Sequence, residues 1–144
     1  KHYIVRTSWV IGDGKKFVRT MLALGKKGVS PTVVADQIGR PTFTAELARI
    51  IDYLLKVKAP YGTYNASNGG DTVNWADFAR AILEEAGFDQ QVTDTTTDKY
   101  FAGKSSVAPR PLNSVLDLSK IETIGFKPTN WQDDLKLYIQ KLKP

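Results

Sequence analysis

A segment rich in β-branched and aromatic residues near the start of the chain constrains the fold more than any other feature. Residues 2–11 read HYIVRTSWVI, a composition that predicts a strand. Residues 3–10 are mostly apolar or β-branched and do not alternate with polar ones. They therefore predict a strand buried on both faces, as in a parallel sheet. Gly12-Asp13-Gly14 predicts the end of that strand.

Helical patterns then alternate with short β-rich segments. Apolar residues at positions 17, 18, 21, 22 and 24 share one helical face, and Lys26-Lys27-Gly28 predicts the end of that helix. Such alternation predicts an α/β fold. The remaining strands of a parallel sheet are not evident, so we expect an amino-terminal partner outside this sequence. The other expected helices lie near 44–59, 74–87, 118–125 and 130–142, the other strands at 32–34 and 62–67, and a strand or loop within 89–107.

Three polar residues are placed to cap helices. Thr44 precedes an apolar helical face at residues 47–55, so we expect it to be the amino cap. Asn74 and Asn130 each have an aspartate three residues later, Asp77 and Asp133, as in a capping box.

Composition narrows the class of protein. The chain has 144 residues, which suits one domain, and its net charge is +5. The lysines lie mainly at expected helix ends, which favours a solvated surface over a nucleic-acid-binding stripe. The sequence has no cysteine and no run of the roughly 20 apolar residues that a membrane helix needs. We therefore expect a cytoplasmic protein that binds neither nucleic acid nor membrane.

The residues offer no self-contained active site. His2 is the single histidine, and the sequence contains no Gly-rich dinucleotide turn, phosphate-binding loop or HExxH motif. Asp133-Asp134 is interpreted as charge at a helix amino-terminus, and Glu84-Glu85 as a solvated helix face. We therefore expect no catalytic residue and no metal site in this chain.

Three segments could bind a ligand. Arg6–Gly12 ends the first strand, where open α/β sheets bind ligands, and Trp9 is either a ligand contact or part of the core. Asp36–Thr42 holds polar donors beside a helix start, so it is either an anion or sugar site or a structural turn. Arg110 lies between two prolines, which suits a diphosphate, although a solvent-facing loop is equally consistent.

Together these segments, with Gly62-Thr63-Tyr64-Asn65, resemble the dTDP-4-dehydrorhamnose reductases of the extended short-chain dehydrogenase family. The motifs that match are, in order, Arg6-Thr7-Ser8-Trp9-Val10, Asp36-Gln37 with Gly39 and Pro41-Thr42, and Arg110-Pro111 with Asn113-Ser114 and Leu116-Asp117. The resemblance implies the carboxyl-terminal part of a Rossmann-like fold: a substrate-binding lobe plus the last sheet strands and helices, here a single portion spanning residues 1–144. It also implies reduction of dTDP-4-dehydro-L-rhamnose by NADPH or NADH. The family's Tyr-x-x-x-Lys pair and Gly-rich turn precede the Arg-Thr-Ser-Trp strand, so we expect this chain alone to be inactive.

The resemblance also implies roles for individual residues. Trp9 matches a tryptophan placed against the sugar, and Thr7 and Ser8 match positions near the nicotinamide. Arg110 matches an arginine assigned to the diphosphate. Ile11 stands where the family usually has tyrosine, which removes a polar group. A loop bordering the active site is matched by Gln37, Gly39, Pro41 and Thr42.

Two alternatives remain open. One is another nucleotide-sugar epimerase or reductase. The other is a non-catalytic regulatory subunit resembling the methionine adenosyltransferase beta subunit, which shares the Arg-Pro, Asn and Leu-Asp pattern. An unpaired edge on the strand at residues 3–10 also predicts self-association into a homo-oligomer.

Overall fold

The computed structural model describes residues 1–14, 16–105 and 107–142. These residues form two compact units, each assembled from separate stretches of the sequence. We call them unit 1 and unit 2. Unit 1 comprises Lys1–Gly12, Arg40–Asp71 and Val115–Pro144, and unit 2 comprises Asp13–Gly39 and Thr72–Ser114.

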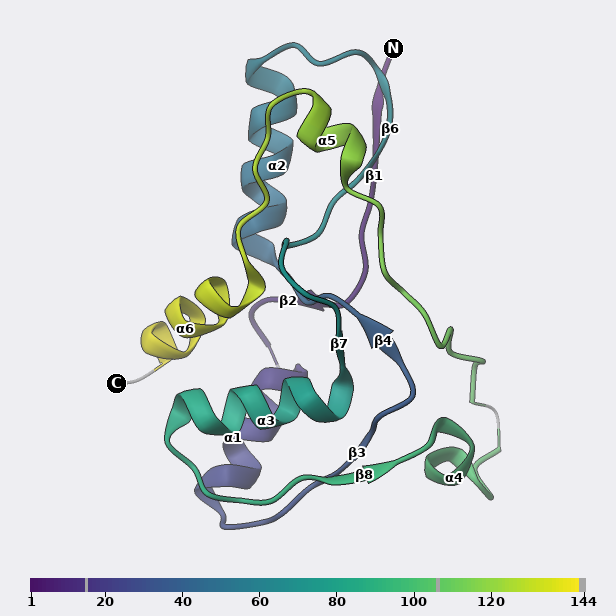
Figure 1. Cartoon of the computed structure of the whole chain (residues 1–144), viewed down its shortest axis with the longest axis vertical. Coiled ribbons are helices and arrows are strands. Elements are labelled where there is room, and N and C mark those ends of the chain that lie inside the picture. The colour runs from purple at the N-terminus through teal and green to yellow at the C-terminus, as the bar shows by residue number, and fades with distance from the viewer. Residues whose placement is uncertain (15, 106, 143–144) are drawn as a thin grey trace. The chain divides into compact units, whose positions relative to one another are not determined.

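Unit 1 is built on two pairs of parallel strands and three helices (Figure 1). Its strands are β1 (Tyr3–Arg6), β2 (Val10–Ile11), β5 (Thr42–Phe43) and β6 (Gly62–Asn65), and its helices are α2 (Thr44–Lys56), α5 (Ser119–Thr123) and α6 (Trp131–Leu142). Strand β1 pairs with β6, and β2 pairs with β5. Because apolar residues recur every three to four positions in α2, that helix buries Ile50 and Leu54 against Tyr64 of β6 and Ile121 of α5.

Unit 2 packs two helices together beside short strands (Figure 1). Its helices are α1 (Phe17–Lys26), α3 (Trp75–Ala86) and α4 (Thr97–Phe101), and its strands are β3 (Thr32–Val34), β4 (Ile38–Gly39), β7 (Val73–Asn74) and β8 (Thr93–Thr95). Strands β3 and β8 are parallel, whereas β4 and β7 are antiparallel. The ring of Phe17 lies 4.6 Å from that of Trp75 and 5.7 Å from that of Phe78, measured between centroids, which joins α1 to α3.

The structure corrects the prediction of one continuous first strand. Strand β1 ends at Arg6, and a separate strand, β2, begins at Val10. The interruption falls at Trp9, whose φ of 48° lies in the left-handed region. Burial on both faces is also not met within this chain, because Ile4 and Arg6 are exposed while Tyr3 and Val5 are half-buried.

Two of the predicted helix caps are confirmed and one is corrected. Asn74 caps α3 as expected: its Oδ1 accepts from the Asp77 N–H at 2.8 Å, and its side-chain amide donates to the Asp77 carboxylate. Thr44 is instead the first residue of α2, which follows Phe43 without a side-chain cap. Asn130 caps α6 as expected: its Oδ1 accepts from the backbone N–H of Gln132, the second residue of the helix, at 3.0 Å. The Asp133 N–H donates instead to the Asn130 backbone carbonyl.

Of two further segments, 36–42 was expected to be a loop and 89–107 a strand or loop. The first is more regular than expected, and the second confirms a strand and adds a helix. The segment at 36–42 includes β4, which pairs with β7, and the first residue of β5. The segment at 89–107 contains both β8 and the short helix α4. Both depend on pairing with residues distant in sequence, which periodicity within the segment cannot reveal.

Candidate functional site

The predicted tryptophan and part of the predicted loop lie side by side in unit 1. Strand β2 runs parallel to β5, with Val10 opposite Thr42 and Ile11 opposite Phe43. The Thr42 N–H donates to the Trp9 carbonyl at 3.0 Å. We call the paired segments Thr7–Gly12 and Pro41–Phe43 the Trp9 wall.

Trp9 itself is held in an uncommon backbone conformation. A bulky residue at positive φ is a backbone outlier, and such conformations cost on the order of 1–3 kcal/mol unless the surroundings fix them. Its side chain is half-buried, so part of the indole remains accessible. Strain of this kind is concentrated at binding sites, which supports a functional role for the wall.

Burial separates the wall residues into two groups. Pro41 and Thr42 have almost no exposed surface. A ligand therefore cannot touch either side chain without movement of the wall, and both residues support the wall from within. Thr7 is exposed and Ser8 is half-buried, so these two and Trp9 are the predicted residues that present accessible surface in unit 1.

The cation beside the wall is already engaged by the protein. Arg40 Nε donates to the Gly70 carbonyl at 3.0 Å, and one of its terminal nitrogens donates to the Leu116 carbonyl at 3.1 Å. These bonds tie together three stretches of unit 1. Arg40, one of the polar donors in the segment at 36–42, therefore stabilises the fold of unit 1.

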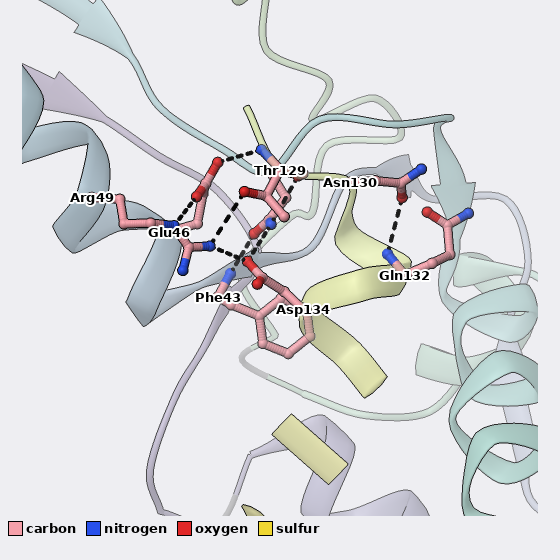
Figure 2. A network of polar contacts seen from close by, with 8 residues as sticks. Phe43, Glu46, Arg49, Thr129, Asn130, Gln132 and Asp134 are labelled. Carbon is pink, nitrogen blue, oxygen red and sulfur yellow. Dashed lines mark hydrogen bonds and ion pairs between the residues drawn. The ribbon is translucent and has the colours of Figure 1, made fainter. Parts of the chain in front are cut away.

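A polar network adjoins Phe43 of the Trp9 wall (Figure 2). The Glu46 carboxylate, fully buried, accepts from Arg49 Nε and from the Thr129 backbone N–H, each at 2.6 Å. The Asp134 carboxylate, 5% exposed, accepts from Arg49 at 2.7 Å and from the Asn68 amide at 2.7 Å. We call these five residues the polar anchor. It joins α2 to the start of α6 and to the loop after β6.

The sequence pattern does not reveal this anchor. Asn68 belongs to an Asn-Gly-Gly segment that predicts only a turn, and Asp134 was interpreted as charge at a helix end. Asp133 and Asp134 do lie in the first turn of α6 as expected, but Asp134 is also buried and bonded to Asn68, 66 residues away. One signal was available: Glu46 and Arg49 are three residues apart on the same helix, a spacing that allows an ion pair.

In unit 2, Gln37 is positioned by the start of α4. Its side-chain amide donates to the Thr97 hydroxyl at 3.0 Å, and that hydroxyl donates to the Asp36 carboxylate at 2.7 Å. The Thr97 backbone N–H also donates to Asp36. The hydroxyl and backbone hydrogen bonds from Thr97 lower the pKa of the Asp36 carboxyl below its ordinary value. Asp36 and Gln37 therefore fix the amino end of α4.

Gly39 lies in β4 between two other segments of unit 2. On one side it pairs with Val73 of β7. On the other, the N–H of its neighbour Ile38 donates to the Leu112 carbonyl, and the Ser114 N–H donates back to the Ile38 carbonyl, both at 2.8 Å. The Arg110–Ser114 segment is thereby held alongside β4.

Arg110 borders a cavity of about 330 Å³ within unit 2. We call it the Arg110 cavity, and its lining residues include Thr97, Asp98, Phe101, Lys104 and Arg110. Arg110 is exposed, and among the residues described its guanidinium has no ion-pair partner. The Lys104 ammonium lies 4.1 Å from the centre of the Tyr100 ring. Two cations beside aromatic rings can bind a phosphorylated ligand.

The predicted residues therefore gather in two places. Thr7, Ser8, Trp9, Pro41 and Thr42 meet in the Trp9 wall of unit 1. Gln37 and Arg110 both approach α4 in unit 2, because Gln37 bonds to Thr97 and Thr97 lines the Arg110 cavity.

Comparison with known proteins decides the family. The model of the RmlD substrate binding domain matches residues 1–143, nearly the whole sequence. The chain belongs to the RmlD substrate binding domain family. It is 41% identical to the spore coat polysaccharide biosynthesis protein SpsK of Bacillus subtilis, over 96% of this chain and 47% of that protein. It is 38% identical to a dTDP-4-dehydrorhamnose reductase of Aggregatibacter actinomycetemcomitans, over 94% of this chain and 49% of the reductase.

A solved structure confirms the expected fold class for this RmlD substrate binding domain. The crystal structure of dTDP-4-dehydrorhamnose reductase from Bacillus anthracis, in complex with NADP, superimposes with a TM-score of 0.86 at 35% identity. The match covers 98% of this chain and 49% of that one. The chain thus has the α/β fold of part of an extended short-chain dehydrogenase, and it spans about half the length of the relatives it matches.

Two further findings concern this RmlD substrate binding domain as the structure describes it. Within residues 1–14, 16–105 and 107–142, no three acidic or histidine side chains gather where they could hold a metal ion. None of the helices described there is both long and apolar enough to cross a membrane.

Proposed function

We propose that this chain is the carboxyl-terminal, substrate-binding portion of a reductase that converts dTDP-4-dehydro-L-rhamnose to dTDP-L-rhamnose for cell-surface polysaccharide synthesis. The observation that carries the proposal is the family match over residues 1–143, together with relatives named for this reaction. In this proposal, a preceding Rossmann portion supplies the dinucleotide-binding turn and the Tyr-x-x-x-Lys pair. This chain supplies the surfaces that hold the nucleotide sugar.

The reaction requires NADPH or NADH as hydride donor. Hydride moves from the nicotinamide to the C4 carbonyl carbon of the sugar, and a proton moves to the carbonyl oxygen. A relative's complex with NADP supports this cofactor class. Thr7 and Ser8 are our candidates to border the nicotinamide, since both follow β1 and keep accessible surface.

We propose ligand-binding roles for residues of each unit, taken separately. Trp9 presents its half-buried indole to the sugar ring, a role suited to a flat apolar face. Arg110 and Lys104 hold the diphosphate at the Arg110 cavity, because arginine binds phosphate oxygens through two donors at once. Gln37, Gly39, Pro41 and Thr42 are largely buried and hold these surfaces in place.

A cytoplasmic location and self-association into a homo-oligomer complete the proposal. The first follows from the reaction, whose cofactor and nucleotide sugar are soluble metabolites. The second follows from strand β1, in which Ile4 is 48% exposed. Among the strands described, β1 pairs only with β6, which leaves its other edge open to a partner. Sedimentation of the isolated 144-residue chain as a monomer would contradict the second.

The test is NADPH consumption by the full-length gene product that contains this chain. We expect turnover with dTDP-4-dehydro-L-rhamnose, and dTDP-L-rhamnose as the product identified by chromatography. The isolated 144-residue chain serves as the control and should not consume NADPH. Turnover with other 4-keto nucleotide sugars but not with this one would overturn the substrate assignment. Turnover by the isolated chain would overturn the assignment of the catalytic residues to the preceding Rossmann portion.

A further inference from the structure

We propose that the last helix, α6, positions the Trp9 wall, and that Asn68, Asp134 and Tyr138 are positioning residues for sugar binding. The inference rests on the proposed function, since it assigns the wall to the substrate. Its structural part, that α6 determines the order of the wall, can be tested without any substrate.

The first connection runs through Asn68. Its Oδ1 accepts from the Phe43 N–H at 2.8 Å, and Phe43 is the residue after Thr42 in β5. Its side-chain amide donates to the Asp134 carboxylate of α6 at 2.7 Å and to the Thr129 carbonyl at 3.1 Å. Asn68 has no exposed surface. One fully buried side chain therefore links a wall backbone group to the start of α6.

The second connection reaches the other strand of the wall. The Tyr138 hydroxyl, one turn further along α6, donates to the Gly12 carbonyl at 2.8 Å. The Tyr138 ring also lies 5.6 Å from the Phe43 ring, centroid to centroid. Helix α6 thus contacts β5 through Asn68 and Phe43, and it contacts the end of β2 through Tyr138.

These connections hold the two paired strands next to Trp9, the residue with the strained backbone. Trp9 precedes β2, and its carbonyl accepts from Thr42 of β5. A left-handed tryptophan persists only where its surroundings over-determine the backbone. Both strands that flank it are attached to one helix, so α6 supplies that constraint. Loosening α6 should let the indole leave the orientation that meets the sugar.

The chain offers a closely matched pair of variants for the test. Tyr138→Phe removes the hydroxyl bond to Gly12 and keeps the ring against Phe43. Tyr53→Phe removes a bond of equal length, from the Tyr53 hydroxyl to the Ile124 carbonyl at 2.8 Å, elsewhere in unit 1. Each variant loses one tyrosine hydroxyl bonded to a backbone carbonyl, so the two should lower the melting temperature of the full-length protein by similar amounts.

Hydrogen exchange followed by mass spectrometry reads out the wall directly. We expect Tyr138→Phe to reduce protection of peptides covering residues 8–12 and 40–44 beyond the general loss seen in Tyr53→Phe. We also expect the KM for the nucleotide sugar to rise about fivefold in Tyr138→Phe, the factor that corresponds to one lost hydrogen bond. In this variant kcat should fall by less than KM rises, because the catalytic pair lies outside the wall.

Asn68→Ala, which removes the acceptor for Phe43, should lower protection of the 40–44 peptide further. If that variant fails to fold, the tyrosine pair still decides the matter.

The outcomes separate this inference from the proposed function. Equal wall protection and equal KM in the two tyrosine variants would overturn the positioning role, even in an active reductase. A wild-type protein that does not reduce the sugar would overturn the proposed function. In that case, selective loss of wall protection in Tyr138→Phe would still support the part played by α6, and its absence would overturn that as well.

Discussion

Arg40 and Arg49 of unit 1 differ from Arg110 of unit 2 in what they bind. In unit 1, Arg40 donates to two backbone carbonyls, and Arg49 joins two buried carboxylates. In unit 2, Arg110 is exposed at the edge of a cavity, and among the residues described it has no ion-pair partner. A cation in a candidate binding segment therefore indicates a ligand site only when no carboxylate or carbonyl of the protein already binds it.

The largest expected effect is on the free energy of unfolding, from a change to a buried carboxylate that binds Arg49. Asp134→Ala should lower the free energy of unfolding by about 3 kcal/mol, because Asn68 and Arg49 each lose a hydrogen bond to this buried carboxylate. Asp52→Ala is the matched control: Asp52 also pairs with a cation at 2.7 Å, but both partners are largely exposed. That change should cost no more than about 0.5 kcal/mol. Equal losses in urea denaturation would contradict the distinction.

A change of Arg110, at the Arg110 cavity, should affect ligand binding and leave the stability of the protein unchanged. Arg110→Ala should weaken binding of the nucleotide sugar by about 2 kcal/mol, the contribution of hydrogen bonds to a charged group. Arg19→Ala, a change of an arginine in α1 of the same unit, is the control and should leave affinity unchanged. Isothermal titration calorimetry of the full-length protein measures both. A lower melting temperature in Arg110→Ala with unchanged affinity would mean that Arg110 is structural.

Two threonines allow a buried hydroxyl without a hydrogen bond to be compared with one that is hydrogen-bonded. The Thr42 hydroxyl is buried without a hydrogen-bond partner among the residues described, whereas the Thr97 hydroxyl donates to Asp36 and accepts from Gln37. Thr42→Val should raise the free energy of unfolding by about 1 kcal/mol, and Thr97→Val should lower it by about the same amount. Thermal denaturation of both variants provides the measurement. Destabilisation by Thr42→Val would show that its hydroxyl has a partner in the full-length protein.

The smallest expected effect is a dependence on pH at the start of α4. Hydrogen bonds from Thr97 lower the pKa of Asp36 below its ordinary value of 3.8. A lowered pKa means that the folded state favours the carboxylate. The stabilisation is therefore present above the ordinary value and is lost as pH falls through the lower, folded-state value. Asp36→Asn should reduce this acid-dependent loss of protection in α4, measured by hydrogen exchange. An unchanged pH profile would show that Asp36 does not control α4.

Sequence periodicity predicted the helices better than it predicted the wall. Repeating apolar positions were sufficient for α1, α3 and α6, because a helix is determined largely by its own residues. The break at Trp9 could not be predicted, since a left-handed tryptophan is imposed by pairing with β5, more than 30 residues away along the chain. The polar anchor was equally hidden. Asn68 and Asp134 look like turn and helix-end residues until the fold brings them together.

The resemblance to known reductases suggested the candidate binding residues. The structure shows which of them are accessible to a ligand. Trp9, Thr7, Ser8 and Arg110 retain surface, whereas Pro41 and Thr42 do not. A single sequence carries no information on which residue of a motif faces solvent when the motif is not periodic. The roles of these residues in binding stay predictions until affinities are measured.

The most direct test of the account compares dTDP with dTDP-L-rhamnose as ligands of the full-length protein. Titration calorimetry of Trp9→Ala and Arg110→Ala would separate the sugar from the nucleotide diphosphate. We expect Arg110→Ala to weaken both ligands by a similar factor and Trp9→Ala to weaken only the ligand that carries the sugar. Equal weakening of both ligands by Trp9→Ala, or no weakening of dTDP by Arg110→Ala, would contradict this expectation.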